Sequence, residues 1–270
     1  MANVHPTALV DSAAHLGAEV TIGPFCVVGP DVTLGGCVEL HSHVLVTGRT
    51  TVGEGCRIFP FATLGTPPQD VKYKGEPTRL EIGANTVIRE QVTINPGTIN
   101  GDGVTRVGAN CFLLIGAHIA HDCQIGDNVT LVNHTMLAGH VSVGDRAILG
   151  GNCAVHQFVR IGPHAFIGGM SGITADVIPF GMAVGNRASL RGLNLVGLRR
   201  GGYSREDVQG LRAAYRFLFG GDGALAQRLT ELKTTYRENP LVQSVVIFMQ
   251  EDSDRSYTVP STGATTADDE

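Results

Sequence analysis

The stretch VGANCFLLIGAHIAHDCQIGDNVTL, residues 107–131, carries an aliphatic residue at every sixth position. The same period holds from Val4 to Leu64, from Ile82 to Ile94 and from Val107 to Ile173. These runs hold 11, 3 and 12 such positions, and all 26 are Leu, Ile or Val. A period of six that persists over so much of the chain predicts the hexapeptide repeat of a parallel β-helix.

Each hexad is expected to form one short strand and one turn, so that three hexads, about 18 residues, complete a triangular coil. The aliphatic side chains then point inward and stack on their equivalents in neighbouring coils, about 4.8 Å away. Rods built from this repeat are similar to one another in coiling left-handed, against the usual right-handed crossover rule. The predicted fold class is mainly β: a left-handed parallel β-helix of hexapeptide repeats with a small C-terminal α-helical domain.

The helical domain is predicted from the part of the chain after Ile173, where the six-residue rhythm stops. Residues 179–198 are expected to be extended. From Ser204 the pattern becomes helical, with Gly-Asp-Gly and Asn-Pro breakers that divide it into about three helices ending near Met249. We therefore assign residues 1–185 to the β-helix and residues 186–255 to a linker and the helical domain. Residues 256–270 are expected to be a disordered tail.

Composition and charge restrict the function classes. Of the 270 residues, 43% are hydrophobic and 17% are charged, and the net charge is −5. The N-terminus does not have the pattern of a signal peptide, and no stretch approaches the roughly 18 apolar residues of a membrane span, so a cytoplasmic location is expected. Residues 187–216 carry seven Arg and two acids. This basic segment is either a solvated helix face or a docking surface for an acidic protein or a phosphate-bearing ligand. No nucleic-acid-binding motif is present.

The cysteines follow the repeat. Five of the six fall four residues after an aliphatic position, in a slot for small side chains: Cys26, Cys56, Cys111, Cys123 and Cys153. They are predicted to be buried thiols in a reducing compartment rather than disulfides or metal ligands.

Two breaks in the repeat, residues 65–81 and 95–106, are polar and rich in Pro, Gly or Asn. They are predicted to be loops that leave the rod, with Asp70 and Lys72 near the tip of the first. An excursion from so regular a scaffold favours a functional role over a tolerated surface insertion.

The segment HIAHD, residues 118–122, places two imidazoles and a carboxylate within the repeat. Because residues about 18 apart lie above one another, His121, His140 and His156 are expected on neighbouring coils of one face. Three such histidines could bind zinc with an open fourth position, as in a hydratase. Alternatively, one neutral imidazole, with an unperturbed pKa of about 6.5, could act as a general base that an adjacent carboxylate orients. No G-x-S-x-G elbow is present, which favours direct attack by a substrate hydroxyl.

At these residues the chain resembles the acyl-carrier-protein–UDP-N-acetylglucosamine O-acyltransferases, which begin lipid A synthesis. The strings that carry the resemblance include QDVKYKGEPTRLEIG, AHIAHDC, LAGHVSVGD, AVHQFVRIG and GLNLVGLRRGGYSRE. The resemblance covers about residues 4–250, and AHIAHDC and QDVKYKGEPTR are its most specific parts. The related N-acyltransferase carries a uridine-binding domain before its repeat, for which this chain has no room, since its hexads begin at Val4.

The resemblance implies a role for individual residues. His121 looks like the general base that takes the proton of the glucosamine 3-hydroxyl, Asp122 like its partner, and the Gly139 N–H like the oxyanion donor. Other positions match substrate-binding residues of the family: Gln69, Asp70, Lys72, His118, His140, His156, Gln157, Gly169, Asn194 and Arg200. No metal is implied, and no resident cofactor, because phosphopantetheine arrives on acyl carrier protein.

The family resemblance also implies partners and specificity. It implies a homotrimer with each site between adjacent rods, and acyl carrier protein and UDP-N-acetylglucosamine as substrates. Gly169 occupies the position that limits acyl length, and a glycine there predicts a longer 3-hydroxyacyl chain. Pro96 departs from the family, where a basic residue is expected, so a polar or charged contact is lost there and a change in detailed substrate affinity is expected.

Two other readings stay open at this point. One is a zinc-dependent hydratase on a similar trimeric rod, and the other is a scaffold rod without catalysis. The residues also leave open whether the acceptor carries a 3-hydroxyl or a 3-amino group, since a histidine base serves either.

Overall fold

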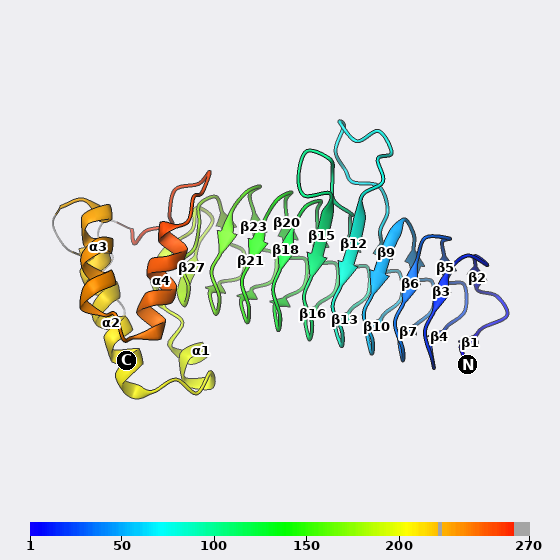
Figure 1. Cartoon of the computed structure of the whole chain (residues 1–270), viewed down its shortest axis with the longest axis horizontal. Helices are drawn as coiled ribbons and strands as arrows, with labels where there is room; N and C mark the ends of the chain where they lie inside the picture. The colour runs from blue at the N-terminus through cyan, green and yellow to red at the C-terminus, as the bar shows by residue number, and fades with distance from the viewer. Residues whose placement is uncertain (221–222, 262–270) are drawn as a thin grey trace.

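The computed structural model describes residues 1–220 and 223–261 of the chain. It is a long rod of stacked coils, with the N-terminus at one end and helices packed at the other (Figure 1). Three sheets, which we call A, B and C, form the faces of the rod. All neighbouring strands are parallel except the last two strands of sheet A, residues 181–184 and 189–193, which are antiparallel. The predicted fold class, a left-handed parallel β-helix with a small C-terminal α-helical domain, is confirmed.

The strands are mostly two residues long because each hexad must also turn the chain to the next face. Sheet A holds β1 (Asn3–Val4), β4 (Thr21–Ile22), β7 (Glu39–Leu40), β10 (Arg57–Ile58), β13 (Val87–Ile88), β16 (Phe112–Leu113), β19 (Thr130–Leu131), β22 (Ile148–Leu149), β25 (Phe166–Ile167), β27 (Gly181–Val184) and β28 (Ser189–Leu193). Sheet B holds β2 (Leu9–Val10), β5 (Val27–Val28), β8 (Leu45–Val46), β11 (Thr63–Leu64), β14 (Thr93–Ile94), β17 (His118–Ile119), β20 (Met136–Leu137), β23 (Ala154–Val155) and β26 (Gly172–Ile173). Sheet C holds β3 (His15–Leu16), β6 (Thr33–Leu34), β9 (Arg49–Val52), β12 (Arg79–Ile82), β15 (Val104–Val107), β18 (Gln124–Ile125), β21 (Ser142–Val143) and β24 (Arg160–Ile161).

The 26 aliphatic positions of the repeat are the last residues of strands β1 to β26, one for each strand. From Ile22 onward each of them is at most 4% exposed, whereas Val4, Val10 and Leu16 lie at the open N-terminal end. Register pairs residues of equal phase, so that Ile119 lies between Ile94 and Leu137. The core is therefore a set of aliphatic columns along the rod axis. The five predicted cysteines are buried between them as free thiols.

The edges of the rod are formed by turns, and many turn residues have a left-handed backbone, which costs a residue with a side chain about 1–2 kcal/mol. We call the edge where the chain passes from sheet B to sheet C the B–C edge. Both predicted loops leave the rod there: residues 65–78 between β11 and β12, and residues 95–103 between β14 and β15. Figure 1 shows the two loops side by side above the rod.

The helical domain follows the last coil. It consists of α1 (Leu195–Arg200), α2 (Arg205–Gly220), α3 (Leu225–Thr235) and α4 (Pro240–Gln250). Helices α2, α3 and α4 match the three predicted helices and pack against one another. Helix α1 corrects the expectation that residues 179–198 are extended, because Asn194 accepts a hydrogen bond from the Gly197 N–H at 2.9 Å and starts a short helix. No helix in the described residues is both long and apolar enough to cross a membrane.

The chain returns from α4 to the rod through a segment that we call the C-terminal strap, residues 251–260. Tyr257 forms a β-bridge with Asp176, and Pro260 forms one with Leu190. Residues 256–260 of the expected tail therefore lie against the rod, and residues 262–270 fall outside the described part. The boundaries assigned to the domains stay a prediction.

Candidate active site

A column of three residues at the B–C edge forms the centre of the candidate site. Asp122, His140 and Phe158 are each 18 residues apart and occupy the same turn position on successive coils. All three have left-handed backbone conformations, with φ of 60°, 61° and 64°. The same conformation recurs at turns along the rod, so it is a property of the repeat and does not by itself mark the site. The repeat thus aligns these side chains along one edge.

His121 and Asp122 form a hydrogen-bonded pair. Nδ1 of His121 lies 2.8 Å from Oδ2 of Asp122, whose side chain is almost fully buried. Thr98, on the second loop, donates to the same carboxylate from its N–H at 2.9 Å and from its hydroxyl at 2.7 Å. The hydroxyl of Thr105 accepts the Asp122 N–H at 2.8 Å and fixes the backbone of the turn. The carboxylate is therefore held in one orientation towards the imidazole.

The environment keeps Asp122 ionised. Burial is the largest single influence and acts to raise the pKa of Asp122, but the hydrogen bonds from His121 and Thr98 outweigh it. The pKa of Asp122 therefore lies below its usual value. An ionised carboxylate only accepts hydrogen bonds, so Nδ1 of His121 carries the proton in this pair and Nε2 is left as an acceptor.

His140 and Gly139 line the other side of His121. The rings of His121 and His140 meet edge to face with 5.1 Å between centroids, and His140 stacks on Phe158 at 4.5 Å. Burial lowers the pKa of His140, partly offset by Asp122, whose Oδ2 lies 3.8 Å from Nε2 of His140. Gly139 is buried, and its missing side chain leaves the space that the His121 ring occupies.

His118 lies on β17, the strand that leads into this turn, three residues before His121. Its Nδ1 is 2.7 Å from the hydroxyl of Thr93, on the neighbouring strand β14. Burial lowers the pKa of His118 below its usual range, so the neutral imidazole is favoured. His118 is therefore a neutral polar group beside the His121–Asp122 pair.

The two loops are joined at their base. The side-chain N–H group of Asn95 donates to the carbonyl oxygens of Thr66 and Pro67 at 3.0 and 3.3 Å. Pro96, where the family resemblance implies a basic residue, is buried and offers no charge. The loops thus form one wall of the site.

The first loop carries three of the predicted substrate-binding residues. Asp70 accepts a hydrogen bond from the Lys72 N–H at 2.9 Å, which shapes the loop tip. Gln69 and Lys72 are exposed, and Asp70 is half-buried.

His156 and Gln157 lie on the next coil of the same edge and are exposed. Of the three histidines that the sequence brings to one face, only His121 and His140 join Asp122 in a group whose ligand atoms all lie within 4.8 Å of one another. His156 is not part of this group. It instead contacts Arg255 of the C-terminal strap, whose Nη2 lies 2.9 Å from its Nδ1.

The remaining predicted residues lie elsewhere on the chain. Gly169 is at the edge between sheets A and B, after β25, and it is exposed. Asn194 and Arg200 belong to the start and end of α1, and they line a cavity of about 520 Å³ beside the end of sheet A. A single chain therefore does not bring these three residues to His121.

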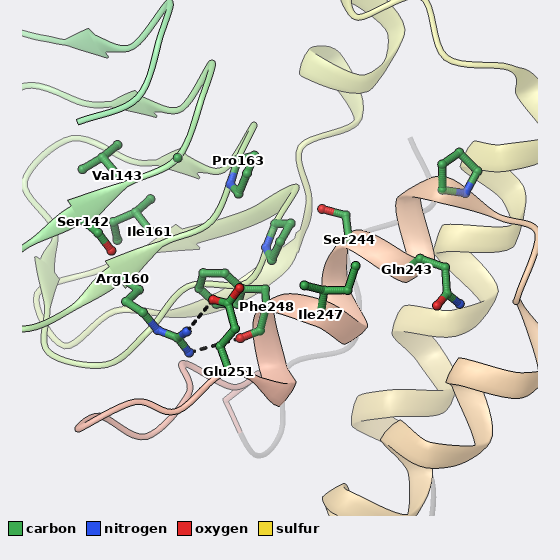
Figure 2. Close-up of a pocket in the computed structure, with 13 residues that line it drawn as sticks. Ser142, Val143, Arg160, Ile161, Pro163, Gln243, Ser244, Ile247, Phe248 and Glu251 are labelled. Atoms are coloured by element: carbon green, nitrogen blue, oxygen red, sulfur yellow. Dashed lines mark hydrogen bonds and ion pairs between the residues drawn. The ribbon is translucent and has the colours of Figure 1, made fainter. Parts of the chain in front are cut away.

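A second cavity, of about 610 Å³, lies between β21, β24 and α4 and contains none of the predicted residues. Figure 2 shows Arg160 reaching from β24 towards Glu251 and Phe248 on its far wall. Most of its lining is apolar, and Arg160 is already paired with Glu251 at 3.1 Å.

Several contributors were not predicted from the sequence. Thr98 and Arg255 lie in non-periodic segments, so spacing carries no signal for them. Phe158 and Thr105 could have been found, because Phe158 is 18 residues after His140 and Thr105 is 17 before Asp122. Stacking by one coil would have placed both beside the site.

Comparisons with known proteins agree with this geometry. A family model described as UDP N-acetylglucosamine O-acyltransferase, domain 2, matches residues 176–258, and a bacterial transferase hexapeptide model of six repeats matches residues 104–139. An acyl-[acyl-carrier-protein]–UDP-N-acetylglucosamine O-acyltransferase from Azorhizobium caulinodans is 53% identical over 100% of this chain and 99% of its own length. One of the same name from Caulobacter vibrioides is 48% identical over 96% and 98%.

Solved structures show the same similarity. A UDP-N-acetylglucosamine acyltransferase from Francisella novicida superposes with a TM-score of 0.93 at 35% identity, covering 96% of this chain and 95% of that one. One from Campylobacter jejuni gives a TM-score of 0.90 at 39% identity, covering 95% and 99%. The similarity therefore extends through the rod, the site and the helical domain.

Proposed function

Because the chain belongs to the family of acyl-[acyl-carrier-protein]–UDP-N-acetylglucosamine O-acyltransferases, we propose that His121 is the general base of this transfer and that Asp122 orients it. The chain is an acyltransferase of this specificity, and the reaction is the first step of lipid A synthesis. The observation that carries the assignment of roles is the 2.8 Å hydrogen bond between Nδ1 of His121 and the buried carboxylate of Asp122.

The pair supports a direct transfer. Nε2 of His121 takes the proton from the glucosamine 3-hydroxyl as its oxygen attacks the thioester carbonyl of a 3-hydroxyacyl chain. The new C–O bond forms, the C–S bond breaks, and the imidazolium returns the proton to the departing phosphopantetheine thiolate. Asp122 stabilises the transient positive charge on His121. The transfer needs no resident cofactor, because the thioester is delivered on acyl carrier protein.

Gly139 is proposed to stabilise the negative charge on the thioester oxygen. Within the described residues, no protein group accepts a hydrogen bond from the Gly139 N–H, although the next residue, His140, donates to the His121 carbonyl at 3.0 Å. A free, buried N–H beside the base is suited to an oxyanion, since preorganised donors act most strongly where water is excluded.

Substrate binding is assigned to the groups around this pair. The loop residues Gln69, Asp70 and Lys72 and the edge residues His118, His140, His156 and Gln157 are proposed to contact the nucleotide sugar and the acyl chain. The basic segment is proposed to dock acidic acyl carrier protein, because most of its arginines are exposed: Arg187, Arg191, Arg199, Arg200, Arg205 and Arg216.

A homotrimer is proposed to complete the site. Asn194, Arg200 and Gly169 lie away from His121 in one chain, so they can serve the same site only from a neighbouring rod. Exposed apolar side chains at the edge between sheets A and B, such as Phe25 at 57% and Met170 at 73%, support packing of rods along this edge. Light scattering should give three times the chain mass of 28.4 kDa, and a monomer in solution would contradict the proposal.

A location in the cytoplasm is also inferred. It is supported by the five buried cysteines, which are all unpaired, as is usual in a reducing compartment.

A second candidate function is a zinc-dependent hydratase, favoured by the group His121, Asp122 and His140. Three ligands could leave a fourth position open for water. The hydrogen bond between His121 and Asp122 already uses one ligand atom of each, which favours the base. Elemental analysis of the purified protein, and activity after chelation, separate the two functions.

The deciding experiment incubates the protein with UDP-N-acetylglucosamine and 3-hydroxyacyl carrier proteins of several chain lengths. In the His121→Ala variant kcat should fall by about 10²- to 10⁴-fold, as expected for removal of a general base. His15→Ala, at an exposed position near the N-terminus, is the matched control. A His121 variant that keeps activity within a few-fold of wild type contradicts the proposed role.

A further inference from the structure

The C-terminal strap is anchored to the rod by a buried carboxylate. Asp176 is fully buried, and Arg160 donates to it from its N–H and from Nε, both at 2.8 Å. The hydroxyl of Ser253, on the strap, donates to the same carboxylate at 2.6 Å. Backbone hydrogen bonds from Asp176 to Ser256 and from Thr258 to Asp176, at 2.8 and 2.7 Å, continue the contact as a short parallel ladder. The strap therefore has a fixed register on the last coil.

Arg160 ties the strap to helix α4 as well. Its guanidinium lies 4.4 Å from the ring centre of Phe248, forms an ion pair with Glu251 at 3.1 Å and donates to the Phe248 carbonyl at 3.2 Å (Figure 2). The side chain of Arg160 is only 15% exposed, so its ion pair with the buried Asp176 is shielded from water, whereas its ion pair with Glu251 reaches solvent. The start of the strap is therefore bound both to helix α4 and to the last coil of the rod.

The anchored strap brings one arginine to the B–C edge. Nε of Arg255 donates to the carbonyl of Gln157 at 3.1 Å, and its Nη2 lies 2.9 Å from Nδ1 of His156. The N–H of Arg255 is itself held by the Ser253 hydroxyl at 3.1 Å. The planar guanidinium thus makes two hydrogen bonds, one to each of two adjacent residues that are proposed to bind substrate.

We propose that Arg255 is a positioning residue that fixes the tautomer of His156. A guanidinium has only donors and stays protonated, so Nδ1 of His156 must accept the hydrogen bond. The proton of the neutral imidazole then lies on Nε2, on the side of the ring away from the strap. His156 presents a donor N–H to an oxygen of the bound substrate.

The Gln157 carbonyl offers a competing arrangement. The carbonyl oxygen lies 3.2 Å from the same Nδ1 of His156. Because a carbonyl oxygen only accepts hydrogen bonds, this contact would require the proton to be on Nδ1. The charged donor of Arg255 is closer, and the carbonyl already accepts Nε of Arg255. Arg255 therefore excludes the opposite tautomer, and its removal would leave the Gln157 carbonyl as the available partner of Nδ1.

The consequence for substrate binding rests on the proposed function, whereas the tautomer itself does not. With the opposite tautomer, Nε2 would become an acceptor and would face a substrate oxygen without a donor between them. A polar group left without its partner weakens binding. Arg255 thus acts on substrate affinity through His156, and it has no direct part in the chemistry at His121.

The test observes His156 directly. Protein labelled with ¹⁵N in histidine is compared before and after Arg255→Ala, with His156→Asn used to assign the signal. In the unsubstituted protein Nδ1 should resonate as an unprotonated ring nitrogen, and in Arg255→Ala it should move towards the position of a protonated one. In Arg255→Lys the Nδ1 resonance should stay closer to its wild-type position, because an ammonium can replace one of the two hydrogen bonds of Arg255. An unchanged His156 spectrum in Arg255→Ala overturns the proposal.

Kinetics provide the second readout. Arg255→Ala should raise KM for one substrate by about three- to tenfold, the range expected for one lost hydrogen bond, with kcat within about twofold. Arg237→Ala, a largely exposed arginine on the helical domain, is the control for loss of charge. A fall in kcat at unchanged KM contradicts a binding role. If the unsubstituted protein transfers no acyl group, the proposed function fails, and the nitrogen spectrum still decides the role of Arg255.

Discussion

Gly139 and His121 are in direct contact across one coil of the rod: a Cβ atom on residue 139 would lie 2.6 Å from Cε1 and 2.7 Å from Nε2 of His121. The atom that is proposed to take the proton therefore rests against a position that only glycine can fill. This contact limits where the His121 ring can lie, in addition to its hydrogen bond to Asp122.

Replacing Gly139 by Ala should displace the His121 ring and lower kcat by about 10²-fold, because a shift of about 1 Å in a reacting group has an effect of this size. Steady-state kinetics check the result. Gly36→Ala, where a Cβ would meet no atom closer than 3.5 Å, is the control. Full activity in Gly139→Ala would show that the base can move without loss.

Thr98 offers a test of how Asp122 is held. Thr98→Val removes the 2.7 Å hydroxyl bond to the carboxylate but keeps the backbone N–H, so kcat should fall by about tenfold, equivalent to one charged hydrogen bond of about 1.5 kcal/mol. Thr98→Ser restores the hydroxyl and should recover most of the activity. Equal rates for the Val and Ser variants would exclude a role for this bond.

Gly169 is predicted to set acyl chain length. A Cβ on this residue would come no closer than 3.2 Å to the Gly151 carbonyl, so the exposed backbone can accept a larger side chain with a small adjustment. Gly169→Met should shift the preference towards a shorter 3-hydroxyacyl donor, measured by competition between carrier proteins of several lengths. An unchanged chain-length profile would contradict the assignment.

His118 should make the stability of the protein depend on pH. Burial lowers its pKa in the folded state, so the unfolded chain binds a proton more readily, and stability falls as the pH drops below about 6.5. His118→Asn should therefore lose less stability between pH 7 and pH 5 than the unsubstituted protein. Urea unfolding at both pH values measures the difference. If the stability of both proteins changes equally between pH 7 and pH 5, His118 does not contribute to the pH dependence.

The repeat made the rod predictable because its period records local packing. Each aliphatic residue at the sixth position became the last residue of one strand, and a spacing of 18 placed Asp122 and His140 at the same turn position of successive coils. A periodic pattern of this kind needs no long-range information, since each coil contacts only its neighbours.

The rest of the site depends on contacts that have no period. Thr98 reaches Asp122 from a loop 24 residues earlier, and Arg255 reaches His156 across 99 residues. Residues 256–260 of the expected disordered tail lie against the rod through backbone hydrogen bonds and bridges with Asp176 and Leu190. Neither composition nor hydrophobic spacing encodes such a pairing.

The left-handed column of Asp122, His140 and Phe158 sets the proposed chemistry of the site against the stability of the turn. Glycine adopts this backbone without strain, so the conformation itself favours a residue that lacks the carboxylate and the imidazole proposed to act at the first two positions. Selection for heat resistance at this edge would therefore tend towards glycine, and selection for turnover would oppose it. A lineage adapting to higher temperature must gain its extra stability elsewhere along the rod, where the same turn position holds residues without a chemical task.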